Sequence, residues 1–133
     1  MKLQAIEGIG KVYAQKLSAA GIKTTEALLD AAATKSGRKN LAEKTGIAET
    51  LILEWANLAD LFRIKGIGEE YSDLLEESGV DTVKELRTRN AENLHKRILE
   101  INEKKNLVNR PPSQKMIESW IEQAKQLPPV LKY

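Results

Sequence analysis

Apolar residues recur along most of the chain at the spacing of an amphipathic helix. Between Gly10 and Ala20 they fall close to the 3.6-residue period that places side chains on one helical face. Similar spacing marks the segments Thr24–Ala32, Ile47–Phe62 and Ala91–Lys105 and the residues around Trp120. No stretch alternates apolar and polar residues as a half-buried strand does. We therefore predict an all-α fold.

Residues near the ends of these segments predict how several helices start and stop. Gly21 followed by the apolar Ile22 suits a helix end of the Schellman type, in which glycine takes a positive φ. Thr82 and Glu85 have the spacing of a capping box, in which each side chain accepts a hydrogen bond from an N–H at the helix start. These signals predict one helix that ends at Gly21 and another that starts after Thr82.

Two further segments contain residues that interrupt helices. The run 34–37, Thr-Lys-Ser-Gly, predicts a loop before a short helix over 39–44. Pro128 and Pro129 predict an extended tail, because proline removes a backbone donor and restricts the residue before it. We expect the tail to follow the last helix.

One segment occurs twice. Ile6-Glu7-Gly8-Ile9-Gly10 returns 58 residues later as Ile64-Lys65-Gly66-Ile67-Gly68. The register then holds without a gap through Tyr13 and Tyr71, Leu17 and Leu75, Gly21 and Gly79, Ile22 and Val80, Thr24 and Thr82, and Leu28 and Leu86. A repeat at a fixed period indicates a duplicated supersecondary unit. We expect a first unit over residues 1–60 and a second over 61–133 that includes the extended C-terminal tail.

Each repeated unit resembles a helix-hairpin-helix, in which a Gly-x-Gly turn joins two short helices. The expected fold is two fused units of this kind, a SAM-like helical bundle in which the units share the long central helix that starts near Ile47. Trp55 and Trp120 lie on apolar helix faces and are predicted to be core residues. Tyr13 and Tyr71, at matching positions, are predicted to pack inside the protein rather than to stack on bases.

A helix that opens from a glycine turn suits an anion. Its first N–H groups lack intrahelical partners, and the helix dipole adds partial positive charge there. Phosphate is the natural ligand of such a position. In the first unit two turns combine with basic residues, so we predict non-sequence-specific binding to a nucleic-acid backbone, with DNA favoured over RNA. The predicted binding residues are Gly8, Ile9, Gly10, Lys11, Lys35, Arg38, Lys39, Lys44, Thr45 and Gly46.

The second unit suits an anion less well. Glu69 and Glu70 follow its glycine turn and would repel a phosphate, so we interpret this turn as structural. A secondary basic patch comprises Lys104, Lys105, Arg110 and Lys115. The alternative function is an adaptor that binds an unidentified protein, with purely structural turns and an acidic strip of Glu69, Glu70, Asp73, Glu76 and Glu77.

The composition narrows the function classes. The chain has no cysteine and one histidine, His95, which argues against a thiolate metal site and a His-based catalytic site. We predict no enzyme activity, no metal, no cofactor and no small-molecule substrate. The formal net charge of +2 is only mildly basic, which leaves the adaptor alternative open. No apolar run reaches the roughly 20 residues of a membrane span, so we expect a cytoplasmic protein.

The chain resembles an uncharacterised family of small bacterial proteins with paired helix-hairpin-helix units, catalogued as a domain of unknown function. The matching stretches are residues 6–10, 20–25, 59–68, 79–86 and 89–94. The resemblance covers nearly the whole chain and implies the tandem fold. It implies no activity.

Overall fold

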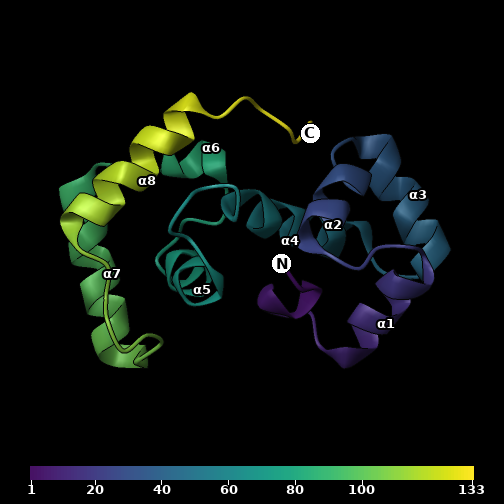
Figure 1. Cartoon of the computed structure of the whole chain (residues 1–133), viewed down its shortest axis with the longest axis horizontal. Coiled ribbons are helices and arrows are strands. Elements are labelled where there is room, and N and C mark those ends of the chain that lie inside the picture. Colours follow the sequence, from purple (N-terminus) through teal and green to yellow (C-terminus); the bar gives the residue numbers. More distant parts are fainter. The chain divides into compact units, whose positions relative to one another are not determined.

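The computed structural model describes all residues, 1–133, and is built from helices alone (Figure 1). A short 3-10 helix, η1, precedes eight α-helices. Their bounds are η1 Leu3–Ala5, α1 Lys11–Ala19, α2 Thr25–Ala31, α3 Lys35–Thr45, α4 Glu49–Leu61, α5 Glu69–Glu77, α6 Val83–Leu86, α7 Ala91–Lys105 and α8 Gln114–Gln126. The all-α prediction is confirmed.

The chain forms two compact units. The first consists of Met1–Asp60 together with Pro129–Tyr133, and the second of Leu61–Pro128. The sequence analysis assigned residues 129–133 to the second unit, whereas the structure places them in the first. The reason is a set of hydrogen bonds: the Lys132 N–H donates to the Ala33 carbonyl oxygen at 2.8 Å, and the Tyr133 hydroxyl donates to Asn57 Oδ1 at 2.6 Å.

The second unit repeats backbone hydrogen bonds of the first, 58 residues later. The repeated bonds include the glycine turn, the end of the following helix and the start of the next one. In donor–acceptor order the matching pairs are Ile6–Leu3 and Ile64–Leu61, Ile9–Ile6 and Ile67–Ile64, Ile22–Leu17 and Val80–Leu75, and Leu28–Thr24 and Leu86–Thr82. The duplication in the sequence is therefore also a duplication of backbone structure.

Each glycine turn packs against a tryptophan of its own unit. Gly8 has a φ of 96° and Gly66 a φ of 99°, in the left-handed region that side chains disfavour. A Cβ atom added to Gly8 would lie 3.4 Å from Nε1 of Trp55, and one added to Gly66 only 2.9 Å from Nε1 of Trp120. Both tryptophans are buried, as predicted. Both turns thus require glycine for conformation, and the turn at Gly66 also requires it for space.

A tyrosine completes this contact in each unit. The rings of Tyr13 and Trp55 have centroids 5.0 Å apart and planes inclined by 63°. The rings of Tyr71 and Trp120 lie 5.3 Å apart at 52°. Inclined contacts of this kind are favourable for aromatic pairs. They confirm the predicted packing role of both tyrosines.

The predicted Schellman ending is present at the end of α1. The Ile22 N–H donates to the Leu17 carbonyl oxygen at 2.9 Å, and the Gly21 N–H donates to the Ser18 carbonyl oxygen at 3.0 Å. These are the two crossed bonds that define the motif. The glycine has a φ of 88°, so the prediction is confirmed.

The capping box at the start of α6 is only half formed. Thr82 Oγ1 accepts from the Glu85 N–H at 2.8 Å, as predicted. The Glu85 carboxylate, however, accepts from Arg89 Nε at 3.0 Å, so the return bond of the box gives way to a side-chain pair. The guanidinium is itself charged and forms an ion pair with the carboxylate, which a neutral backbone amide cannot do.

Helix α3 begins earlier than predicted, because the run 34–37 does not form a loop. Thr34 caps the helix, and its Oγ1 accepts from the Gly37 N–H at 3.0 Å. Gly37 lies inside the helix, where a Cβ would come within 2.3 Å of the Ala31 carbonyl oxygen. The glycine therefore permits close packing on the end of α2 rather than a chain reversal.

We expect Gly66→Ala to destabilise the protein more than Gly21→Ala. Both residues have positive φ, which costs about 1–2 kcal/mol for alanine. Only the new side chain at Gly66 meets the indole of Trp120, whereas Gly21 has open space. Overpacking adds about 1–3 kcal/mol, so urea unfolding should show the larger loss for Gly66→Ala. Equal losses would contradict the proposed contact.

Candidate functional site

Helix α1 begins without any group that caps it. Its N-cap residue, Gly10, has no side chain, and no acidic residue lies in the first turn. The first backbone bond of the helix joins the Ala14 N–H to the Gly10 carbonyl oxygen at 3.0 Å. The three preceding amides, of residues 11–13, therefore have no intrahelical acceptor, and together with the helix dipole they form a partially positive end.

The surroundings of this helix start are open. Gly10 and Lys11 are exposed, and Val12 is 64% exposed. A Cβ added to Gly10 would meet no atom within 4 Å. An anion therefore has space to approach the free amides, and Lys11 lies at the same end of the helix.

Ile9 differs from the other residues predicted here. Its N–H donates to the Ile6 carbonyl oxygen at 3.1 Å, and its side chain is buried. The amide of Ile9 is therefore not available to a ligand. Its role is to close the turn that precedes α1.

No other α-helix starts in the same way. Five helices have a side-chain cap, provided by Thr24, Thr34, Thr82, Asn90 and Ser113. The remaining two, α4 and α5, have acidic residues in the first turn. Such carboxylates compensate the positive helix end. Helix α1 is the only one with neither form of compensation.

The matching turn of the second unit is closed by a glutamine. The Lys65 N–H donates to Gln123 Oε1 at 2.9 Å, and Gln123 Nε2 donates to the Lys65 carbonyl oxygen at 3.2 Å. The corresponding residue of the first unit is Leu58, which has no polar side-chain atom and is buried. Sequence reasoning missed this difference, although the alignment of Trp120 with Trp55 pairs Gln123 with Leu58.

Acidic residues mark the start of α5. Glu69 and Glu70 occupy its first turn and are exposed, where α1 has Lys11 and Val12. Two carboxylates at this position oppose an anion within the Debye length of about 8–10 Å. The start of α5 thus lacks the electrostatic character of the start of α1.

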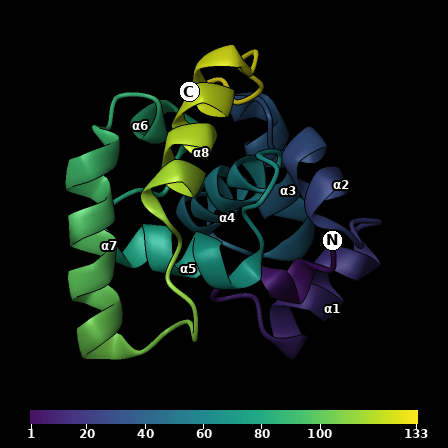
Figure 2. The same cartoon turned by 60° about the vertical axis from the view of Figure 1, so that its left-hand side comes forward.

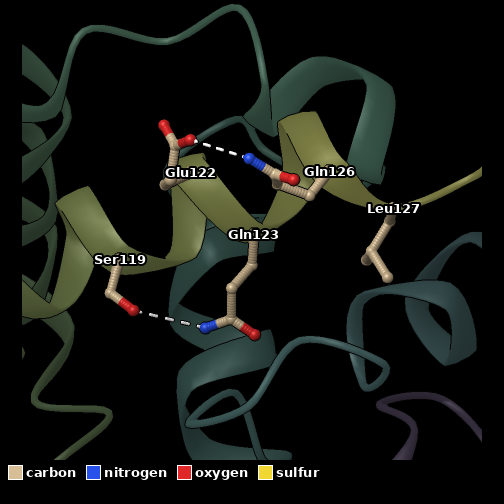
Figure 3. Close-up of a pocket in the computed structure, with 5 residues that line it drawn as sticks. All are labelled: Ser119, Glu122, Gln123, Gln126 and Leu127. Atoms are coloured by element: carbon tan, nitrogen blue, oxygen red, sulfur yellow. Dashed lines mark hydrogen bonds between the residues drawn. The ribbon is translucent and has the colours of Figure 1, made fainter.

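An open depression of about 450 Å³ lies along α8 and is lined by Ser119, Glu122, Gln123, Gln126 and Leu127 (Figure 3). Its polar side chains bond to one another: Gln126 Nε2 donates to Glu122 at 3.1 Å, and Gln123 Nε2 donates to Ser119 Oγ at 3.3 Å. These polar side chains are therefore partly engaged with one another.

The second predicted phosphate site, at Thr45 and Gly46, is wrong. Gly46 ends α3 with a φ of 73°, and its N–H donates to the Ala42 carbonyl oxygen at 2.8 Å. The Ile47 N–H donates to Thr45 Oγ1 at 3.2 Å. The amides of this turn are already paired, and they lie at the C-terminal end of α3, where the dipole is negative.

Arg38 was also predicted to bind nucleic acid, and the structure contradicts this. It is only 5% exposed. Its Nη1 donates to the Ala32 carbonyl oxygen at 2.9 Å and its Nη2 to the Lys132 carbonyl oxygen at 2.8 Å. The guanidinium thus joins the end of α2 to the C-terminal tail. A basic residue that sequence reasoning assigned to the surface has a structural role.

The lysines of α3 are exposed but are not gathered around the glycine turn. Lys35 and Lys39 lie four residues apart, on one side of the helix, and Lys44 lies in its last turn. In Figures 1 and 2 the beginning of α3 and the turn before α1 lie at opposite ends of the first unit. The start of α3, to which Lys35 belongs, therefore lies apart from the glycine turn before α1.

The secondary basic patch of the second unit is exposed, and part of it is engaged. The Lys105 ammonium pairs with the Glu77 carboxylate. The Arg110 carbonyl oxygen accepts from the Tyr71 hydroxyl at 3.0 Å. Lys104 and Lys105 also lie in the last turn of α7, where positive charge stabilises a helix.

We expect Arg38→Met to lower the free energy of unfolding by about 2–4 kcal/mol, because two carbonyl oxygens lose a charged donor. Lys39→Met, the matched change at the neighbouring exposed residue, should alter it by less than about 0.5 kcal/mol. Urea unfolding of both variants tests the assignment. A similar loss of stability for the two substitutions would contradict the structural role of Arg38.

No helix in the structure has both the length and the apolar character that crossing a membrane requires.

Comparisons with known proteins identify a family. No match was found among curated proteins or among solved structures. Residues 7–127, most of the chain, match the family described as Domain of unknown function (DUF4332). The chain therefore belongs to the DUF4332 family.

Proposed function

We propose that this protein binds the backbone of nucleic acids, duplex DNA in particular, at the start of α1, without sequence specificity. The observation that carries the proposal is the helix start itself: α1 is the only α-helix with neither a capping side chain nor an acidic first turn. The proposal interprets the glycine turn and α1 as part of a helix-hairpin-helix. It makes no use of Ile9, Arg38, Thr45 or Gly46.

Each part of this helix start has a role in the proposed contact. The amides of Lys11 and Val12 donate to phosphate oxygens, and the partial charge of the helix end, about half a unit, attracts them. Because Gly10 has no side chain, the sugar-phosphate backbone of the ligand can come close to the helix start. The Lys11 ammonium adds a full positive charge. None of these groups reads a base edge, so the contact carries no sequence information.

The charge of the chain sets the expected strength. Because the net charge is only +2 and the proposed contact contains a single basic side chain, Lys11, few phosphates are neutralised, and we expect non-specific affinities of roughly 10⁻⁴–10⁻⁶ M at physiological salt. Binding should weaken as salt rises, because the release of counterions drives it. The second unit takes no part in this contact in our proposal, because Glu69 and Glu70 occupy the equivalent helix start.

We expect Lys11→Glu to weaken duplex binding and to reduce the slope of log K against log salt by about 1. The substitution removes one phosphate contact and places a carboxylate beside the free amides. Anisotropy of a labelled duplex, titrated with protein at two salt concentrations, measures both quantities.

Lys16→Glu is the matched control, because it makes the same change of net charge in the last turn of the same helix. It should leave the slope nearly unchanged. If both variants lost affinity equally, the effect would be one of overall charge and the helix start would not be the site. Undetectable binding of the unmodified protein at low salt would refute the function itself.

A further inference from the structure

The C-terminal tail occupies a built site in the first unit. Arg38 Nη2 donates to the Lys132 carbonyl oxygen at 2.8 Å, and the Lys132 N–H donates to the Ala33 carbonyl oxygen at 2.8 Å. Both backbone groups of one tail residue are thus bonded to the unit. On either side of it, Leu131 is buried and the Tyr133 hydroxyl donates to Asn57 at 2.6 Å.

These contacts follow the alternation of an extended segment. Residues 128–133 belong to no helix, and successive side chains of an extended chain point to opposite sides. Leu131 is buried, Lys132 is exposed, and Tyr133 is 61% exposed but contacts the unit through its hydroxyl group. The site therefore binds the backbone of the middle residue, the buried side chain of the residue before it and the hydroxyl of the tyrosine after it, a combination that peptide-binding grooves also use.

One bond that holds the site together does not involve the tail. The Arg38 guanidinium is also held by the Ala32 carbonyl oxygen at 2.9 Å, through a bond that the tail does not contribute. The tail is joined to α8 through Pro128 and Pro129, both exposed and outside any helix. Release of the tail therefore unwinds no helix, and it leaves the bond between Arg38 and the Ala32 carbonyl oxygen available.

We propose that this site recognises extended peptide segments of other proteins with an aliphatic residue followed, two positions later, by a tyrosine, and that the tail of the chain occupies it in cis. This interaction is independent of nucleic-acid binding. A tethered tail competes at an effective concentration of the order of millimolar. A partner segment therefore binds well only when the tail is released or when it makes additional contacts.

The test uses the full chain with the substitution Leu131→Asp, which weakens the tail and leaves the site itself unchanged. The probe is a fluorescently labelled synthetic peptide with the sequence of residues 128–133. We expect it to bind the variant saturably and at least tenfold more tightly than the unmodified protein, as measured by anisotropy. Adding Arg38→Met to the variant should abolish binding, and so should aspartate in place of leucine in the peptide.

Two binding results would overturn the proposal. One is a folded Leu131→Asp protein, verified by circular dichroism, with no saturable binding up to about millimolar peptide. The other is equal affinity for the variant and the unmodified protein, which would place the peptide elsewhere. If Leu131→Asp does not fold, Leu131→Ala takes its place. Failure of both to fold would show that the tail is an obligatory structural strap, and this also rejects the proposal.

Discussion

The contact between a tryptophan indole and a glycine turn is the constraint on which each unit depends. A Cβ on Gly8 would be in van der Waals contact with Trp55 at 3.4 Å, and one on Gly66 would come within 2.9 Å of Trp120, too close for a side chain. The indole, buried at the end of the unit's sequence, therefore fixes the turn at its beginning. The position of the glycine turn then determines where the following helix, α1 or α5, starts. Because the N-cap of that helix is also glycine, the helix starts with no side chain over its first amides.

The two units share this backbone and differ in what surrounds it. At the start of α1 the chain has Lys11 and an exposed valine, whereas α5 has two glutamates at the same positions. The second turn is also fastened by the two hydrogen bonds of Gln123. The same backbone turn thus precedes a basic helix start in the first unit and an acidic one in the second. This difference is why our proposal assigns phosphate binding to the first unit alone.

Local signals in the sequence predicted local structure well. The repeat, the buried tryptophans and the Schellman ending follow from spacing and from the chemistry of glycine, and the structure confirms them. Arg38 could not be predicted, because its partners lie 6 and 94 residues away and a charged residue in a helix is normally exposed. The long-range bond between Arg38 and Lys132 is also one reason why residues 129–133 belong to the first unit and not, as predicted, to the second. Gly46 resembled the other glycine turns in sequence, and only its position at a helix end revealed that its amide is paired.

Amide chemical shifts measured during a titration with a short DNA duplex test the central claim most directly. Our account predicts that the largest shifts occur at the amides of Lys11, Val12 and Tyr13, which have no intrahelical acceptor at the start of α1. It predicts little change at Glu69 and Glu70, at the equivalent start of α5. Largest shifts in α5, or shifts of the same size at both helix starts, would show that the uncompensated end of α1 does not direct binding.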